Sequence, residues 1–235
     1  MSKGFDPEQL PRELCACRDA LAAAAEAAGL EATRVSEEIL LDGWIVRCSG
    51  SQLKRERCVV PRGEGTASLA DKLLQVEGIY AKAGLPVLYR ITPFAPSGLD
   101  RVLSEQGYSA FEDSRVMLAG LDRRSGMAKP AAGTFKQTVS ARGLVLELCE
   151  DGKTLAEGRF KIDGDMAGLY GIHTLTEARG RGYASLIVAD LLRRAETAGA
   201  KHTCLQVGAS NEVARHLYEK FGFIDRYAYW YRQKW

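Results

Sequence analysis

The most informative stretch of this chain is Thr176–Ala184, which reads TEARGRGYA. It stands between a predicted strand over Met166–Leu175 and a predicted helix over Ser185–Ala198. A helix begins with N–H groups that have no partner within the helix, and its dipole adds about half a positive charge there. Because Gly180 and Gly182 have no Cβ, the backbone can turn sharply and approach an anion closely. The stretch therefore predicts a loop that binds phosphate.

A second motif follows that helix. Cys204–Phe223 reads CLQVGASNEVARHLYEKFGF, which predicts a strand, a turn at Asn211 and a short helix that ends at Gly222. The two motifs together resemble the GNAT superfamily of N-acetyltransferases. The family carries a loop R/Q-x-x-G-x-G/A, and an Asn seven residues before a Tyr that is followed by Gly-Phe. The matching positions here are Arg179, Gly182, Ala184, Asn211, Tyr218, Gly222 and Phe223.

The resemblance covers about Leu144 to Trp235. The run Leu205–Asn211 is most similar to the ribosomal-protein-alanine type, whose L-E-V-x-A-S-N differs mainly by a glutamate at the place of Gln206. The resemblance implies an acetyl-CoA-dependent N-acetyltransferase that moves the acetyl group to a primary amine by direct attack in a ternary complex. Two alternatives stay open: a non-catalytic acyl-CoA-binding regulatory module, and a transferase that uses another acyl-CoA donor.

The same resemblance implies where acetyl-CoA binds. The pantetheine arm would pair with the backbone of Ile172, His173 and Thr174, at the splayed end of the central strand, where one N–H would stabilise the oxyanion. Asn211 would hydrogen-bond the cofactor arm or cap the helix over Glu212–Lys220, and the two roles are compatible. The diphosphate would lie on the loop and the first helical turn, at Arg179, Gly180, Arg181, Gly182, Tyr183, Ala184 and Ser185.

Tyr218 is the first catalytic candidate, because in the family this Tyr gives a proton to the departing CoA thiolate. Its alternative role is that of an ordinary core aromatic. The general base is not Gln206, which stands at the place of the family's glutamate, because a side-chain amide takes no proton at neutral pH. Two other routes fit the sequence. His173 lies on the central strand beside the expected reaction centre and is the second catalytic candidate, with an ordinary pKa of about 6.5. A water chain that ends at Glu147 or Glu177 is the competing route.

The two halves of the chain resemble each other. Arg62–Leu69 echoes Arg179–Leu186, and later elements repeat with an offset between 114 and 117 residues. A nearly constant offset predicts two tandem copies of one α/β unit. The first copy has Ser104 where the second has Tyr218, so we expect it to be degenerate.

We therefore expect an α/β fold of tandem GNAT-like copies, each a mixed, mostly antiparallel twisted sheet flanked by helices. The predicted domains are a degenerate amino-terminal copy at residues 1–121 and a catalytic copy at 144–235. Residues 122–143 are the predicted linker, because 122–133 lacks an apolar period and contains Gly and Pro.

Local patterns in the first copy predict its elements. Apolar residues of 14–28 share one helical face, and Gly29 is the expected stop. Two strand-like runs follow at 37–48 and 55–60, the first interrupted by an Asp-Gly turn, and then a helix at 68–83.

The sequence is compatible with two arrangements of the acceptor site. Too few residues separate Leu121 from Leu144 for the two helices that usually wall this site in the family. Either the amino-terminal half supplies the wall, or the cleft is open to a larger substrate. In the tail, Tyr227, Tyr229 and Tyr231 alternate as in a strand with one aromatic face, which either packs in the core or contacts the acceptor.

Composition agrees with an enzyme of this kind. The chain has 235 residues, 46% of them hydrophobic, and a net charge of +2 from 32 basic and 30 acidic residues, which argues against nucleic-acid or membrane-surface partners. The expected partners are acetyl-CoA and an amine-bearing small molecule or peptide, for a monomer or homodimer. Six scattered cysteines and an amino terminus without a signal-peptide core favour reduced thiols, no metal site and a cytoplasmic location.

Overall fold

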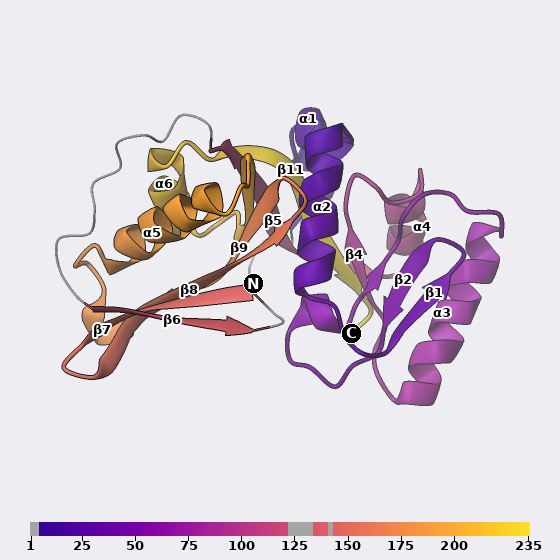
Figure 1. The fold of residues 1–235 in the computed structure, drawn as a ribbon. Coiled ribbons are helices and arrows are strands. Elements are labelled where there is room, and N and C mark those ends of the chain that lie inside the picture. Colours follow the sequence, from indigo (N-terminus) through magenta and orange to yellow (C-terminus); the bar gives the residue numbers. More distant parts are fainter. Residues whose placement is uncertain (1–4, 122–133, 141–142) are drawn as a thin grey trace.

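Eleven strands form one continuous sheet in the computed structural model, which describes residues 5–121, 134–140 and 143–235 (Figure 1). The strand order is β1-β2-β3-β4-β11-β5-β10-β9-β8-β7-β6. Neighbouring strands are antiparallel except in the pairs β3–β4 and β9–β10, which are parallel. The predicted class, a mixed and mostly antiparallel sheet flanked by helices, is confirmed.

Each half contributes the same succession of elements: three strands, a helix, a strand, a helix and a last strand. The first copy consists of β1 (Glu38–Leu41), β2 (Trp44–Arg47), β3 (Val59–Val60), α3 (Leu69–Ala83), β4 (Leu88–Ile91), α4 (Leu99–Glu105) and β5 (Ser109–Gly120). The second consists of β7 (Gly143–Glu150), β8 (Lys153–Asp163), β9 (Met166–Thr174), α5 (Tyr183–Thr197), β10 (His202–Gly208), α6 (Glu212–Lys220) and β11 (Ile224–Gln233). The internal repeat in the sequence is thus a repeat of structure.

The two copies exchange their last strands. β11, which ends the second copy, lies between β4 and β5 of the first copy, with Trp230 opposite Ile91. β5, which ends the first copy, pairs along β10 of the second copy, with Met117 opposite Leu205. The halves therefore share one sheet instead of forming two separate sheets.

The linker prediction for residues 122–143 is wrong where β6 (Thr134–Ser140) lies. β6 pairs with β7 along its whole length and forms an edge of the sheet. The glycines and prolines that suggested a linker all precede this strand, so they do not support a linker that extends to residue 143. Residues 122–133 and 141–142 lie outside the described residues.

Two helices precede the first copy where the sequence predicts one. α1 (Arg12–Ala16) ends before Asp19, which caps α2 (Ala20–Ala32) by accepting a hydrogen bond from its first turn at 2.9 Å. Gly29 lies inside α2 and does not stop it. The missing Cβ leaves room for the side chain of Gln206, whose Nε2 would lie 2.7 Å from a Cβ at that position.

α2 crosses the middle of the molecule and packs on β8 and β9 of the second copy (Figure 1). The Tyr170 hydroxyl donates to the Ala28 carbonyl at 3.0 Å, and the Lys161 ammonium pairs with Glu31 at 3.0 Å. Small buried alanines bring the helix close to the sheet. The amino-terminal half thus covers a face of the second copy.

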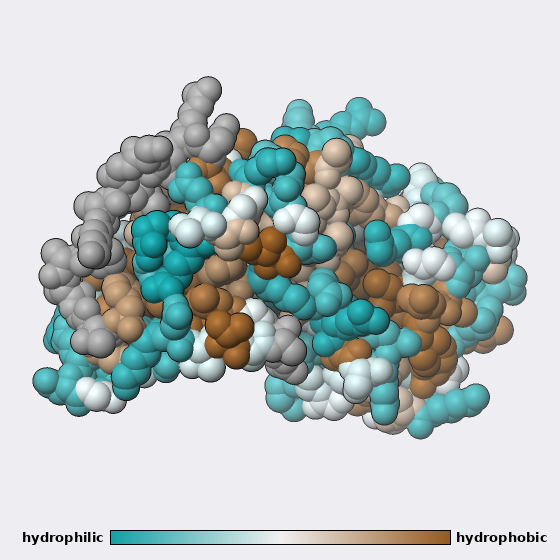
Figure 2. Space-filling view, viewed as in Figure 1, coloured by the Kyte–Doolittle hydropathy of each residue, from teal (hydrophilic) through white to brown (hydrophobic). Residues whose placement is uncertain are grey.

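Three buried clusters form the core. One lies under α5 and α6, one under α2, and one under α3 and α4. On the face in Figure 2, apolar side chains also gather over β1 and α3, where Ile39, Leu40 and Leu74 are exposed. All six cysteines are free thiols, three of them buried. Within the described part of the chain, no helix is long and apolar enough to cross a membrane.

Candidate active site

The loop between β9 and α5 has the conformation that anion binding requires. It begins with a short 3-10 helix, η3 (Thr176–Ala178). Gly180 and Gly182 have φ angles of 78° and 80°, in the left-handed region that residues with a Cβ rarely adopt. A Cβ at either glycine would meet no atom within 4 Å, so both positions face open space. Gly182 is the N-cap of α5, and no side chain caps the helix.

The N–H groups of residues 180–185 donate no hydrogen bond within the part of the chain that the structure describes. The first to donate is the N–H of Leu186, to the Gly182 carbonyl at 3.2 Å. The side chains of Arg179 and Arg181 are exposed beside this row. Six free amides at the positive end of a helix, with two guanidinium groups nearby, suit a diphosphate.

The corresponding loop of the first copy is closed by a carboxylate of the chain itself. Asp42, in the turn between β1 and β2, pairs with the Lys72 ammonium at 2.7 Å and accepts from the N–H groups of Thr66 and Ala67 at 2.9 and 3.0 Å. These hydrogen bonds hold the pKa of Asp42 well below its ordinary value, so the group stays charged. A Cβ at Gly65 would clash with this carboxylate. The place of an anion is already filled here.

β9 and β10 are neighbours over only part of their length. Their pairing runs from Met166–His202 to Leu169–Leu205 and then stops. Beyond that point β9 continues to Thr174 beside β8, and β10 continues to Gly208 beside β5. The two strands therefore splay apart where the resemblance places the pantetheine arm.

Ile172, His173 and Thr174 all lie in this splayed part of β9. Gly171, with a φ of 59°, forms an irregularity in the pairing with β8. After it Ile172 packs in the core under α5, while His173 is exposed and lies opposite Glu157 of β8. The Thr174 hydroxyl is buried and finds no partner among the described residues.

The second motif places Asn211 and Tyr218 on α6. Asn211 is the N-cap, and its Oδ1 accepts from the Ala214 N–H at 3.2 Å. Tyr218 is buried beside Phe223, with ring centroids 6.0 Å apart, and its hydroxyl makes no hydrogen bond to the described residues. Burial raises the pKa of Tyr218, so the phenol stays protonated at neutral pH.

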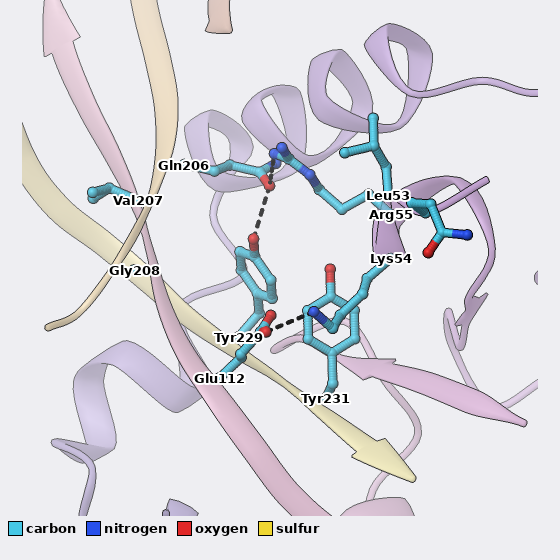
Figure 3. A pocket seen from close by; sticks show the side chains of 10 residues that line it. Leu53, Lys54, Arg55, Glu112, Gln206, Val207, Gly208, Tyr229 and Tyr231 are labelled. Carbon is cyan, nitrogen blue, oxygen red and sulfur yellow. Dashed lines mark hydrogen bonds and ion pairs between the residues drawn. The ribbon is translucent and has the colours of Figure 1, made fainter. Parts of the chain in front are cut away.

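A cavity of about 260 Å³ lies between the two halves, next to the splayed end of β10 (Figure 3). The first copy and the carboxyl-terminal strands both contribute to its walls. Neither Tyr218 nor His173 is among the residues that line it. The lining residues are Gln52, Leu53, Lys54, Arg55, Glu112, Gln206, Val207, Gly208, Tyr229 and Tyr231.

Gln206 lies at the centre of this cavity's polar contacts. Its Oε1 accepts from Arg55 Nη1 at 2.8 Å and from the Tyr229 hydroxyl at 3.1 Å (Figure 3). Both lone pairs of the oxygen are therefore used. Tyr229 and Tyr231 are buried and also line the cavity, while Tyr227 packs in the core. The tyrosine strand therefore packs in the core and also lines this cavity, and its contact with an acceptor stays a prediction.

Residues 121–223 match the model of the acetyltransferase (GNAT) family. The match contains both the glycine-rich loop and the Asn–Tyr motif. The carboxyl-terminal half of this chain is thus similar to the GNAT acetyltransferase family. Over a longer stretch the chain is 25% identical to YobR of Bacillus subtilis, an uncharacterized N-acetyltransferase, in an alignment that covers 81% of this chain and 90% of that protein.

Solved GNAT structures share the architecture. A GCN5-related N-acetyltransferase from Kribbella flavida superposes with a TM-score of 0.69 at 16% identity, over 90% of this chain and 95% of that one. A tandem GNAT protein from the clavulanic acid biosynthesis pathway gives a TM-score of 0.56 at 12% identity, over 70% of this chain and 69% of that one. At these identities the likeness shows the fold, and it confirms the tandem GNAT arrangement. The finer likeness to the ribosomal-protein-alanine type stays a prediction.

The cavity residues of the first copy were not predicted from the sequence. The pattern at residues 55–60 predicts a strand, but Arg55 belongs to the short 3-10 helix η2 (Lys54–Glu56), and β3 is limited to Val59–Val60. No pattern pointed to Glu112, which has a φ of 54° at an irregularity between β5 and β11. The one available signal was the basic run at residues 54–57, and such runs are common on surfaces.

Proposed function

We propose that this protein is an acetyl-CoA-dependent N-acetyltransferase that transfers the acetyl group to a primary amine by direct attack in a ternary complex. The observation that carries the proposal is the row of N–H groups at residues 180–185 that donate to none of the described residues, next to two strands that splay apart. The equivalent loop of the first copy is filled by Asp42. One cofactor site per chain follows.

The diphosphate binds to the amides of residues 180–185 in this proposal, and Arg179 and Arg181 add charge-assisted hydrogen bonds. The pantetheine arm extends along the backbone of residues 172–174, with Asn211 on its other side. The amine approaches from the cavity, because residues 206–208 line it and belong to the part of β10 that lies beyond the last pair with β9.

Acetyl transfer then needs one bond to form and one to break. The amine nitrogen attacks the thioester carbonyl carbon, and a backbone N–H of residues 172–174 stabilises the oxyanion. The C–S bond breaks, and the thiolate takes a proton from the Tyr218 hydroxyl. In water this proton transfer is uphill by about 2 kcal/mol, since phenol and thiol pKa values are near 10 and 8.5. Burial raises the pKa of Tyr218, but it also desolvates the thiolate and makes it more basic.

The amine also has to lose a proton. His173 is exposed on the splayed strand and reaches the reaction centre through water in this proposal. Glu177 is a weaker candidate, because its hydrogen bond from Lys153, at 2.8 Å, lowers its pKa. Glu147 accepts a hydrogen bond from the Thr154 hydroxyl at 3.0 Å.

Two measurements test the proposal. Gly182→Asp places a side chain and a negative charge where the diphosphate binds, so we expect acetyl-CoA affinity to fall strongly in calorimetry. Gly78→Asp adds the same charge at an exposed position of α3 and serves as the control. Equal affinity of Gly182→Asp and the parent would remove the loop from the site. A thiol-release screen against amines, amino acids, aminoglycosides and peptides then identifies acceptors.

A non-catalytic acyl-CoA-binding module is the second candidate, and Gln206 is the observation that favours it. The ribosomal-protein-alanine type has a glutamate at this position, whereas this chain has an amide whose oxygen already accepts hydrogen bonds from Arg55 and Tyr229. Tight acetyl-CoA binding without thiol release from any amine would support the module. Release of thiol from succinyl-CoA or propionyl-CoA alone would instead identify a different acyl donor.

A further inference from the structure

Three arginine side chains converge around Gln206. Arg47, Arg55 and Arg90 line a small second cavity that shares Gln206 with the larger one. Arg47 and Arg90 each form an ion pair with a glutamate of the amino-terminal half, at 2.8 and 2.5 Å. Arg55 pairs with no carboxylate in the part of the chain that the structure describes. Among these three arginines, Arg55 is therefore the one whose charge is not neutralised by a described carboxylate.

The larger cavity shows the same imbalance. Its charged lining residues are Lys54, Arg55 and Glu112. The Lys54 ammonium pairs with Glu112 at 2.7 Å, and these two side chains are 33% and 50% exposed, at the rim. What remains is the positive charge of Arg55. A guanidinium group presents several donors in a fixed plane and binds carboxylate or phosphate oxygens well.

Arg55 is held in a defined position. Its Nη1 donates to Gln206 Oε1 at 2.8 Å, and its backbone carbonyl accepts from Arg47 at 2.8 Å. Gln206 is fixed in turn by the Tyr229 hydroxyl and lies against α2 at Gly29. Gln206 is therefore a positioning residue for the guanidinium group, which explains why an amide serves at this place.

From this charge arrangement we infer that the acceptor amine carries an anionic oxygen group, a carboxylate or a phosphate, that binds Arg55. The inference rests on the proposed function. An anion at Arg55 brings the attached amine next to residues 206–208, where the thioester is expected. A volume of about 260 Å³ is below the roughly 300–1,000 Å³ of drug-sized sites, so it suits a small acceptor such as an α-amino acid. Polyamines and aminoglycosides would add positive charge beside an unpaired arginine.

The test compares matched amines in a thiol-release assay with acetyl-CoA. α-Amino acids are paired with their decarboxylated amines, and O-phosphoethanolamine is paired with ethanolamine, which separates carboxylate from phosphate. In either the carboxylate pairs or the phosphate pair, we expect kcat/KM to be about 10- to 150-fold higher for the anionic amine than for its counterpart that lacks the anionic group. This factor corresponds to the strength of a hydrogen bond between charged groups. Arg55→Met should abolish this preference, and Arg55→Lys should keep part of it. The KM for acetyl-CoA should stay at the parent value in both.

Arg101→Met is the charge-matched control, since Arg101 is 79% exposed on α4 and is not among the residues that line the cavity. Equal kcat/KM for both members of every pair would overturn the inference and leave the proposed function intact. Weaker acetyl-CoA binding in Arg55→Met would also overturn it, because Arg55 would then bind the cofactor.

Absence of thiol release from every amine would instead count against the proposed function. Calorimetric binding of the same pairs to the CoA complex then tests the anion site by itself. Preference for the anionic member that depends on Arg55 supports the site, and equal binding in the parent and Arg55→Met overturns it. Circular dichroism checks that both Arg55 variants are folded.

Discussion

Replacing Glu26 by Gln removes the charge that neutralises a buried arginine between α2 and the sheet. Glu26 and Arg90 are only 2% and 3% exposed and are joined by two hydrogen bonds of 2.5 and 3.1 Å. The Tyr227 hydroxyl donates to the same carboxylate at 2.6 Å. Gln is close in shape to Glu, so the variant isolates the loss of charge and leaves the guanidinium group without a carboxylate partner.

The expected loss of stability follows from burial. Removing one partner of a buried ion pair costs about 3–5 kcal/mol. Arg90 keeps a cation–π contact with Tyr229, whose ring centroid lies 4.2 Å from the guanidinium carbon, and such a contact stabilises by about 1–2 kcal/mol. We therefore expect a loss near the lower limit, about 3 kcal/mol. For a chain of this size the melting temperature should fall by about 6–12 °C.

Urea unfolding of Glu26→Gln, followed by tryptophan fluorescence and far-UV circular dichroism, measures this loss. Tyr227→Phe removes one hydrogen bond to the same carboxylate and should cost less, about 1.5 kcal/mol. Glu26→Leu combined with Arg90→Met removes both charges and should regain most of the loss, since apolar pairs often replace buried ion pairs without cost. The reasoning would be refuted if the free energy of unfolding of Glu26→Gln lay within about 0.5 kcal/mol of the parent value, which is the usual range for surface changes.

The same pair predicts how stability depends on pH. Burial raises the pKa of Glu26, but the charge and hydrogen bonds of Arg90 and the hydrogen bond from Tyr227 outweigh it, so the pKa lies below the ordinary 4.5. A lowered pKa in the folded state gives stability that is complete above the unfolded value and is lost as pH falls through the folded value. The parent should lose stability below about pH 4.5, and Glu26→Gln should lose less over that interval.

Three further predictions concern the site. Tyr218→Phe should lower kcat by about 10²–10⁴-fold at an unchanged KM for acetyl-CoA in thiol-release kinetics, and full turnover would assign the proton to another group. Calorimetric titration should give one CoA per chain, because Asp42 fills the first loop, and a second CoA that is lost in Gly65→Asp would contradict this. The pH–rate profile should rise as the acceptor amine deprotonates, and His173→Ala should blunt its lower limb. An unchanged profile would remove His173 as the base.

The glycine-rich loop between β9 and α5 was predictable from the sequence because its conformation is a property of the local backbone. Gly180 and Gly182 adopt positive φ angles, and the helix begins directly after them, so local spacing alone specifies the free amides. The Asn211 cap is also local, three residues from its donor. Local patterns likewise predicted the hairpin of β1 and β2, with its turn at Asp42–Gly43.

Contacts between residues far apart in the chain leave no local pattern in the sequence. Asp42 reads as an ordinary turn residue, and its role depends on amides 24 and 25 residues later. β5 and β11 each read as the last strand of a copy, and nothing in a strand's own pattern states which strand lies beside it. Arg55 and Gln206 are 151 residues apart, so no motif could join them. The cavity became visible only once the sheet was assembled.

Strand exchange makes the degenerate copy part of the proposed acceptor site. Arg55 comes from the first copy, Glu112 from its exchanged strand β5, Gln206 from the second copy, and Tyr229 from the exchanged strand β11. Residues of both copies thus line the cavity. β5 also pairs along the whole of β10, so it supports the strand that bears Gln206. The first copy has its own anion loop closed by Asp42, yet it supplies the uncompensated charge and a neighbouring strand for the loop that stays open. In the proposed function its contribution is therefore to acceptor binding and to the shape of the sheet, whereas cofactor binding is assigned to the second copy.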